Sequence, residues 1–157
     1  MRFEIETKVK AQERYRTATR NGKTFRYTPK QTKDFQKLIQ KHFTAEIEKQ
    51  ELELPLFEKG QEVALVVYVG KEIPKSYSKK RVREILENGR KPTTKPDVDN
   101  YGKIVMDALN KLAYHDDAQI STSLVKKMYV KQGTPEKLLV DLERDLPPEI
   151  IKKMEGE

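Results

Sequence analysis

The sequence predicts a single α+β domain, built from a mixed β-sheet and packed helices. Its 157 residues match one ordinary domain, which at this length buries roughly 70% of the surface that the unfolded chain exposes. Segments with the two-residue period of strands are interspersed with segments that carry apolar residues at helical spacing, and there is no internal repeat. The predicted order is strand, basic loop, helix, strand, basic helix, helix, strand, strand, helix, which is typical of this fold class.

The first third of the chain is predicted to contain a strand, a basic hairpin or loop, and one long helix. Residues 2–9 alternate charged side chains with apolar or Thr side chains, the pattern of a strand with one buried face. Residues 10–31 follow no period, but Asn21-Gly22 is a strong signal for a tight turn. Apolar residues then recur at helical spacing for about four turns, after Thr32 in a position to cap the helix.

The middle of the chain is predicted to contain the core strand and two more helices. Residues 63–69 are apolar on both faces, which indicates a central strand. Residues 78–89 predict a short basic helix that Ser78 caps. Its inward-facing residues are expected to be Val82, Ile85 and Leu86. Residues 100–114 have the apolar spacing of an amphipathic core helix, with Asp99 placed to cap its exposed amides.

The last part of the chain is predicted to add two strands and a helix. Residues 120–131 and 137–143 have strand patterns and are interpreted as a hairpin around the turn at residues 132–135. A short helix is expected after them. We therefore place the domain at residues 1–146 and a helical tail at residues 147–157.

The composition excludes several classes of protein. Cysteine is absent, which rules out a disulfide scaffold, a thiolate zinc site and a cysteine nucleophile. The longest apolar run, residues 63–69, is far too short to span a bilayer, and the first residues do not resemble a secretory signal. We expect a cytoplasmic protein with no membrane partner.

Basic side chains exceed acidic ones and are concentrated in two segments. The 32 Lys and Arg against 25 Asp and Glu give a formal charge of +7. Residues 8–41 and 71–103 carry this excess, whereas the remaining segments are net acidic. Such segments suit a phosphate backbone, although a solvated lysine-rich surface is the alternative interpretation. Within residues 10–31, Arg alternates with aromatic side chains, which suits either stacking on exposed bases or an ordinary surface hairpin.

Four carboxylates lie inside this basic context. Asp97 and Asp99 precede the predicted core helix, and Asp116 and Asp117 follow it. Because Pro96 disfavours helix in the residue before it, the chain is expected to arrive extended, with Asp97 and Asp99 projecting from the same side. Carboxylate oxygens are the ligands that Mg²⁺ and Mn²⁺ prefer, and such an ion leaves positions for a phosphate oxygen and an attacking water. The pattern indicates a metal site for phosphodiester hydrolysis.

Each half of this pattern also has a simpler structural interpretation. An Asp-x-Asp sequence before a helix is typical of caps, and paired aspartates after a helix suit a turn. Distance is a further objection, because a fourteen-residue helix is roughly 21 Å long and would separate Asp97 from Asp117. The two halves meet only if the helix is shorter and the next loop folds back, or if a second subunit supplies one carboxylate.

Two basic side chains near the carboxylates have open roles. Lys103 lies one helical turn from both Asp99 and Asp107, so it either forms surface ion pairs or neutralises charge on a leaving oxygen. His115, beside the predicted turn, is a ligand, a general base or a structural residue.

Several motifs occur in a fixed order along nearly the whole chain. They are Arg14-Tyr15-Arg16, Tyr27-Thr28-Pro29-Lys30-x-Thr32, Pro74-Lys75-Ser76-Tyr77-Ser78-Lys79-Lys80-Arg81, Lys95-Pro96-Asp97-Val98-Asp99-Asn100, and Asp107-Ala108-Leu109 followed by His115-Asp116-Asp117-Ala118-Gln119-Ile120. As an ordered set they resemble the RusA family of Holliday-junction resolvases, endonucleases of phage and prophage origin.

The resemblance implies a RusA-like fold and a homodimeric nuclease that acts in DNA recombination and repair. Such an enzyme nicks symmetrically related strands of a four-way junction and leaves 5′-phosphate and 3′-hydroxyl ends. By motif position, Asp97, Asp99 and Asp117 are the implied metal-binding carboxylates, and Lys103 is the assisting lysine. The implied cofactor is Mg²⁺, for which Mn²⁺ can substitute. Asp116 directly precedes Asp117, the aspartate that matches the family motif, and its assignment as a metal ligand is less direct.

One position departs from the family pattern. The best-known members carry arginine immediately before the first aspartate, where this chain has Pro96. Any phosphate contact there must come from Lys95 or another basic side chain. The residues expected to bind nucleic acid are Arg14, Arg16, Arg20, Arg26, Lys30, Lys75, Lys79, Lys80, Arg81 and Lys95.

Two other functions are compatible with the same residues. The first is a nucleic-acid-binding protein without catalysis, whose acidic cluster forms caps, turns or a structural ion site. The second is a nuclease that cuts flaps, forks or RNA, because nothing in the sequence reads a base edge and structure-specific binding depends on shape.

Overall fold

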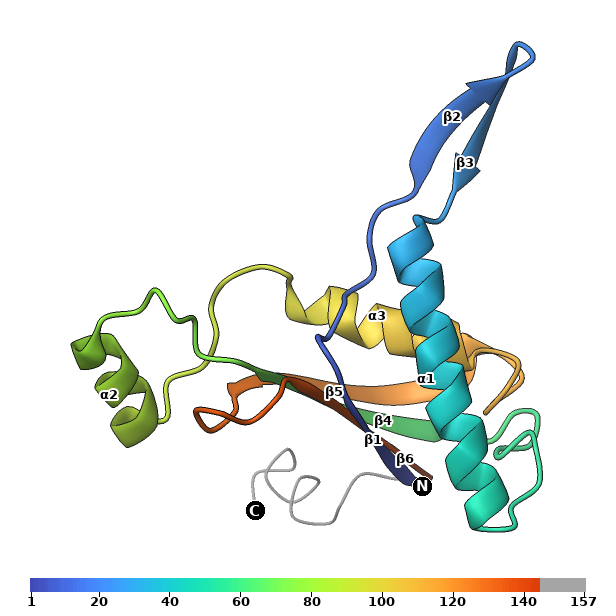
Figure 1. The fold of residues 1–157 in the computed structure, drawn as a ribbon. Helices are drawn as coiled ribbons and strands as arrows, with labels where there is room; N and C mark the ends of the chain where they lie inside the picture. The colour runs from blue at the N-terminus through green and yellow to red at the C-terminus, as the bar shows by residue number, and fades with distance from the viewer. Residues whose placement is uncertain (145–157) are drawn as a thin grey trace.

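A computed structural model describes residues 1–144 as one α+β domain with a mixed sheet and three α-helices, which confirms the predicted fold class. The strands of the main sheet have the order β1-β6-β4-β5. They are β1 (Arg2–Glu6), β4 (Val63–Lys71), β5 (Ile120–Tyr129) and β6 (Lys137–Glu143). β4 runs parallel to β5 and antiparallel to β6, which is itself antiparallel to β1. Helices α1 (Lys30–Lys49) and α3 (Val98–Leu109) cover one face of this sheet (Figure 1).

β4 lies inside the sheet because it is apolar on both faces, as predicted. Val63, Leu65 and Val67 are buried in the main core with α1 and α3. Ala64 and Val66 point to the opposite face and form a second, smaller cluster. A strand that buries both faces gains most when it also has a hydrogen-bonded neighbour on each side, which β5 and β6 provide.

The prediction that the last two strands form a hairpin is wrong. The expected turn exists, with Gly133 at φ 82°, but β4 separates β5 from β6. The sequence pattern identifies both strands and gives no information about their partners, which depend on contacts far apart in the chain. β4 and β5 are therefore joined by a long crossover, residues 72–119, which contains the other two helices.

The first strand and first helix differ from the prediction at one end each. β1 ends at Glu6 rather than at residue 9, because its neighbour β6 begins at Lys137, the partner of Glu6. α1 begins after Pro29, and the prediction that Thr32 caps it is wrong, since Thr32 is buried within the first turn. The proline already has a helix-compatible φ of −53°.

The basic segment near the amino terminus is a hairpin, one of the two predicted forms. Strands β2 (Arg16–Arg20) and β3 (Lys23–Tyr27) pair only with each other. Asn21 and Gly22 both have positive φ, at 51° and 71°, as a two-residue hairpin turn requires. The hairpin projects away from the body of the domain beyond the first turn of α1 (Figure 1).

α2 (Lys79–Asn88) has the predicted bounds and caps. The Ser78 hydroxyl accepts a hydrogen bond of 3.3 Å from the Arg81 amide, and Gly89 ends the helix in the left-handed conformation. The predicted inward face is only partly correct, because Ile85 is buried while Leu86 is 56% exposed. Figure 1 shows α2 beyond the end of the sheet, away from α1 and α3.

α3 is shorter than predicted and begins earlier. It spans Val98–Leu109 instead of residues 100–114, and Asp97 rather than Asp99 occupies the N-cap position. Its buried side chains follow the predicted helical spacing. They are Tyr101, Ile104, Val105, Ala108 and Leu109. The chain reverses at Lys111, with φ 62°, and returns along the helix.

The predicted tail helix at residues 147–157 lies outside the described residues, so the proposed boundary at residue 146 stays a prediction. In the described part of the chain, no helix has the length and apolar character needed to cross a bilayer.

Candidate functional site

An acidic cleft of about 680 Å³ lies between α3 and β5, and it contains most of the residues predicted to be catalytic. Asp99, Lys103 and Asp107 follow one another along the same face of α3 at four-residue intervals, as i, i+4 and i+8 positions do. Asp117 reaches the cleft from the short 3₁₀ turn before β5. The other residues that line the cleft are Val98, Gly102, Met106, Ser123, Leu124 and Val125.

Asp117 reaches this cleft because the chain folds back after α3. Buried Tyr114 anchors the return, and its hydroxyl donates a hydrogen bond of 2.8 Å to the Met106 carbonyl. Burial raises the pKa of Tyr114, and the nearby carboxylates of Asp117 and Asp107 raise it further. A single chain therefore brings Asp99 and Asp117 together, as the first of the two predicted arrangements requires.

Asp97 does not line the cleft. It occupies the exposed N-cap position, with φ −73° and ψ 156°, and its carboxylate makes no capping hydrogen bond. Asp99 is already inside the first helical turn, so the prediction that both side chains project from one extended segment is wrong. The helix starts two residues sooner than predicted, at Val98 rather than at residue 100.

Asp116 has a structural role that sequence analysis allowed as its simpler interpretation. Its carboxylate accepts a hydrogen bond of 2.9 Å from the Ala118 amide and caps the 3₁₀ turn. Gln119 completes this capping box by accepting from the amides of His115 and Asp116. His115 itself is exposed. The box holds the turn that presents Asp117.

Asp107 is a site residue that the sequence analysis treated only as a contact of Lys103. It lies deeper than Asp99, and burial raises its pKa; Lys103 opposes this rise while Asp117 adds to it. The signal in the sequence was the four-residue spacing of Asp99, Lys103 and Asp107, which forms a polar stripe on an otherwise apolar helix.

The donor set of the cleft fits a hard divalent cation. Asp117 disfavours the ionised form of Asp107, and a cation between carboxylates removes this kind of repulsion. Among residues 1–144, no three acidic or histidine side chains lie close enough to enclose an ion. Mg²⁺ usually binds through one or two carboxylates, keeps several waters and takes further oxygens from substrate phosphates.

Lys127 fixes the segment that leads to Asp97, a role that the sequence analysis missed. Its ammonium on β5 donates hydrogen bonds of 2.8 Å to the Thr94 carbonyl and 3.0 Å to the Pro96 carbonyl. Both carbonyls belong to the loop immediately before α3. A lysine inside a strand gave no sequence signal for this contact, because the loop lies 31 residues away along the chain.

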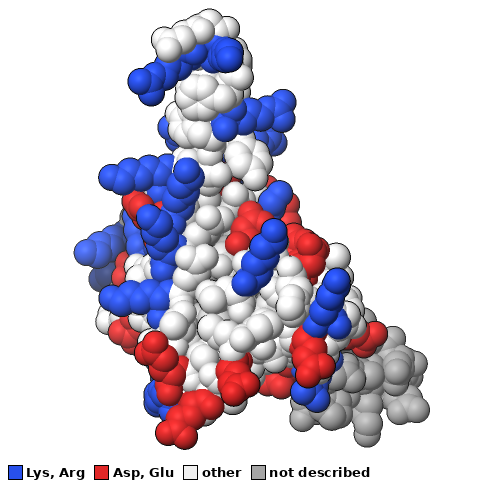
Figure 2. All heavy atoms as spheres, turned by 90° about the vertical axis from the view of Figure 1, so that its right-hand side faces the viewer, with Lys and Arg blue, Asp and Glu red and all other residues white. Residues whose placement is uncertain are grey.

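The predicted nucleic-acid-binding residues form two groups on either side of the body of the domain. The first group covers the hairpin and its base, where Figure 2 shows Lys and Arg gathered without acidic side chains at the projecting end. Its members are Arg14, Arg16, Arg20, Arg26 and Lys30, all exposed. The second group lies on and around α2. Its members are Lys75, Lys79, Lys80 and Arg81, also exposed.

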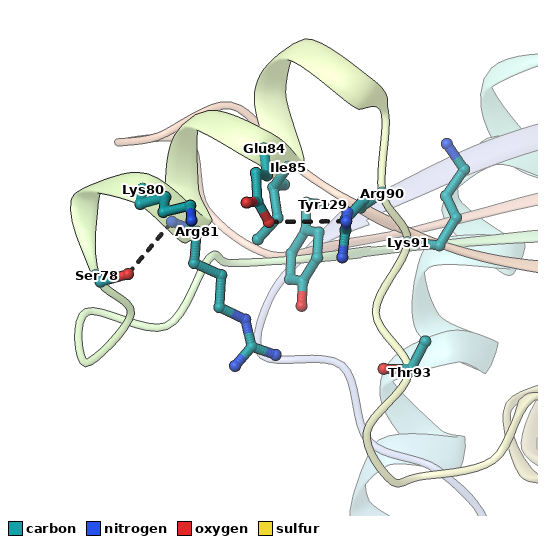
Figure 3. A pocket seen from close by; sticks show the side chains of 9 residues that line it. All are labelled: Ser78, Lys80, Arg81, Glu84, Ile85, Arg90, Lys91, Thr93 and Tyr129. Atoms are coloured by element: carbon teal, nitrogen blue, oxygen red, sulfur yellow. Dashed lines mark hydrogen bonds and ion pairs between the residues drawn. The ribbon is translucent and has the colours of Figure 1, made fainter.

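A second cleft of about 600 Å³ opens between α2 and the loop that leaves it (Figure 3). Lys80 and Arg81 line it as members of the second group, and Arg90 and Lys91 add two cations that the sequence analysis did not single out. The Arg81 guanidinium lies 3.7 Å from the centre of the Tyr77 ring, which holds it in place. This cleft suits phosphate oxygens, and Lys95 follows it on the exposed loop to Asp97.

Comparisons with known proteins show the family to which the chain is similar. The profile of the family described as "Endodeoxyribonuclease RusA" matches residues 5–140. The chain is also 36% identical over 141 residues to a protein of Bacillus subtilis (strain 168) that is named uncharacterized protein YqaN. That alignment covers 88% of this chain and 94% of the relative.

Proposed function

The chain belongs to the RusA endodeoxyribonuclease family, and on that premise we propose that it resolves four-way DNA junctions by Mg²⁺-dependent hydrolysis, with paired nicks. One observation carries the proposal: a single cleft contains Asp99 and Lys103, which lie on α3, together with Asp117, which lies on the 3₁₀ turn before β5. Simple caps and turns do not require these three side chains to meet.

The carboxylates of the cleft are the groups that would hold the metal. Asp99 and Asp117 are the proposed ligands, with Asp107 beside them in the cleft, and Asp97 would be a further candidate from the N-cap position of α3. Bound Mg²⁺ polarises a phosphate oxygen and lowers the pKa of water. Without a cation, the same carboxylates would repel the DNA backbone.

Lys103 is proposed to stabilise charge on the reacting phosphate. It is exposed and lies between Asp99 and Asp107 along α3. Its ammonium would neutralise charge that develops on the leaving oxygen. Lys127 acts indirectly, because it holds the loop that carries Asp97.

The two basic groups are proposed to position the DNA. Phosphate contacts from Arg and Lys fix the register of a duplex and carry no sequence information. The hairpin and α2 lie at different ends of the domain (Figure 1), and the DNA backbone is proposed to contact both groups. A two-fold dimer would present one cleft to each of two opposed strands, which suits a near-symmetric four-way junction.

The test is cleavage of a synthetic four-way junction, a flap and a linear duplex, each with Mg²⁺ and with EDTA. We expect paired nicks in the junction only with Mg²⁺, and a loss of at least about 100-fold in Asp99→Asn. Asp34→Asn is the matched control, because Asp34 is an exposed aspartate on α1 that does not line the cleft. Full cleavage by Asp99→Asn would refute the site, binding without products would favour a non-catalytic protein, and preference for the flap would change the substrate.

A further inference from the structure

The β2–β3 hairpin buries none of its residues. Nine of the ten residues in its two strands are exposed and the tenth, Ala18, is half-buried. Two-stranded hairpins are marginally stable in water and normally pack on a third element. In this chain the hairpin extends into solvent instead (Figures 1 and 2), so a surface outside residues 1–144 of this copy is expected to cover it.

Its two faces differ in chemistry. The register pairs Arg16 with Tyr27, Ala18 with Phe25 and Arg20 with Lys23, which places these six side chains on one face. The other face is polar. It carries Thr17, Thr19, Thr24 and Arg26, with a hydrogen bond of 3.2 Å between the hydroxyls of Thr19 and Thr24. One face is therefore aromatic and cationic, while the opposite face is dominated by threonine.

The aromatic rings of this face are exposed and lie side by side. Phe25 is 48% exposed and Tyr27 is 38% exposed, and their ring centroids are 6.3 Å apart. With Tyr15 at the base of the hairpin, they are the only exposed aromatic side chains in residues 1–144. An exposed aromatic pair at this position indicates a contact surface rather than part of the core.

The charge around the rings identifies the chemistry of the partner. Residues 14–30 carry six Lys and Arg and no Asp or Glu, so the partner is a polyanion. Aromatic rings beside Arg and Lys bind nucleic-acid bases by stacking while the cations hold the phosphates. A continuous duplex hides the faces of its bases within the stack, whereas a branch point interrupts the stack and exposes them.

We infer that the aromatic face of the hairpin stacks on bases exposed at the branch point of DNA and thereby distinguishes branched DNA from linear duplex. This inference rests on the proposed function, since it assigns the recognition of the branch to Phe25 and Tyr27. The cations of the same face, Arg16, Arg20 and Lys23, hold the phosphates beside those bases.

The segment that leads into the hairpin is hydrogen-bonded to the first turn of α3, next to a residue of the acidic cleft. The Gln12 amide donates a hydrogen bond of 2.9 Å to the Asn100 carbonyl, and Asn100 directly follows Asp99 in α3. Tyr27 is the last residue of β3, at the base of the hairpin, and Phe25 is its middle residue; because a five-residue strand is about 17 Å long, both rings lie within about 10 Å of the base along the strand. The branch point would then be held a short way from the phosphate that is cut, which is the arrangement that a junction-specific nuclease needs.

The test is the ratio of affinities for a four-way junction and for a linear duplex of the same sequence, measured in EDTA at one salt concentration. The variant is Phe25→Ala/Tyr27→Ala, which removes both rings and keeps every cation. We expect the junction affinity to fall by about 5- to 150-fold, the usual effect of removing one stacked base, with the duplex affinity within about twofold. A 2-aminopurine at the branch point should no longer show the fluorescence change that wild type causes.

Two variants control for the folding of the hairpin. Phe25→Tyr/Tyr27→Phe keeps both rings, so it should keep the wild-type ratio. Thr17→Ala changes the opposite face and should also keep it. Because neither ring packs in the core, thermal unfolding of the double alanine variant should match wild type.

Three results would overturn the inference. The first is an unchanged ratio in the double alanine variant, and the second is an equal loss for junction and duplex, which would make the hairpin a general phosphate contact. The third is loss of a dimer on sedimentation, which would make this face an interface between copies. Cleavage by the wild-type protein is measured separately from binding. If wild type does not cleave but the double alanine variant has a lower ratio of junction to duplex affinity, only the proposed hydrolysis is refuted.

Discussion

Replacing Gly102 by alanine tests how closely α3 approaches β5 beneath the acidic cleft. A Cβ at this position would lie 2.9 Å from Val125 Cγ2, closer than side-chain carbons normally approach. Val125 is β-branched and stiff at χ1, so the helix must move away from the strand. Overpacking of this kind costs about 1–3 kcal/mol, while alanine is favoured over glycine within a helix by about 1 kcal/mol. We therefore expect Gly102→Ala to lower the free energy of unfolding by up to about 2 kcal/mol.

The assay is urea unfolding followed by circular dichroism, extended to a double-mutant cycle. Val125→Ala removes the atom that meets the new Cβ, so Gly102→Ala should be less harmful, or stabilising, in that background. The m-value should be unchanged, because the same surface is exposed on unfolding. A single variant that is about 1 kcal/mol more stable than wild type, with no coupling to Val125, would refute the close approach of helix and strand.

Three other predictions concern the two clefts. Lys103→Ala should lower junction cleavage by about 10²- to 10³-fold while leaving junction binding in EDTA within about threefold, because it acts on developing charge rather than on affinity. Arg90→Ala/Lys91→Ala should reduce the slope of log K against log salt by about 0.9 for each phosphate that the variant no longer neutralises. Asp107→Asn should flatten the pH dependence of the free energy of unfolding. Burial raises the pKa of Asp107 in the folded state, so the protonated side chain favours folding. This stabilisation is fully present below the ordinary carboxyl range and is lost as the pH rises through the folded-state pKa.

Each of these predictions has an outcome that contradicts it. If Lys103→Ala lowered junction binding and junction cleavage equally, Lys103 would be a contact to the DNA phosphate backbone rather than a residue that acts on the reacting phosphate. An unchanged salt slope would remove the α2 cleft from the DNA-binding surface. For Asp107→Asn, the urea midpoint of unfolding should be compared with that of wild type at about pH 4 and pH 7. The variant should have the higher midpoint only at the higher pH. A higher midpoint at both pH values would mean that ionisation of Asp107 does not cause the difference in stability.

Local patterns were enough to find most elements of the fold. The Asn21-Gly22 turn, the caps at Ser78 and Gly89, and the doubly apolar run of β4 all depend on neighbouring residues, and all three predictions are confirmed. Strand pairing was wrong for β5 and β6 because it depends on which strands are adjacent after folding. The ends of α3 were misplaced because Asp99 is as suitable a first-turn residue as a cap, and only the packing of the helix decides between them.

The residues that line the acidic cleft were only partly predicted from the sequence, and the chemistry assigned to them stays a prediction. Asp99, Lys103 and Asp117 meet as expected, while Asp97 lies outside the lining of the cleft. Asp107 was missed as a member of the cleft because an i+4 neighbour of a lysine has an ordinary explanation as an ion pair. Lys127 could not be found at all, since a contact between a strand and a distant loop leaves no period in the sequence.

The crossover between β4 and β5 has a consequence for the evolution of this chain. The two strands are held together by their own ladder, and α3 packs in the core, so length changes before α3, in residues 72–93, would leave both the sheet and α3 in place. α2 and the loop after it could be shortened, extended or exchanged with those of a related enzyme, while α3 and its aspartates stay in place. Such exchanges would be a direct route to new substrate preferences on an unchanged scaffold.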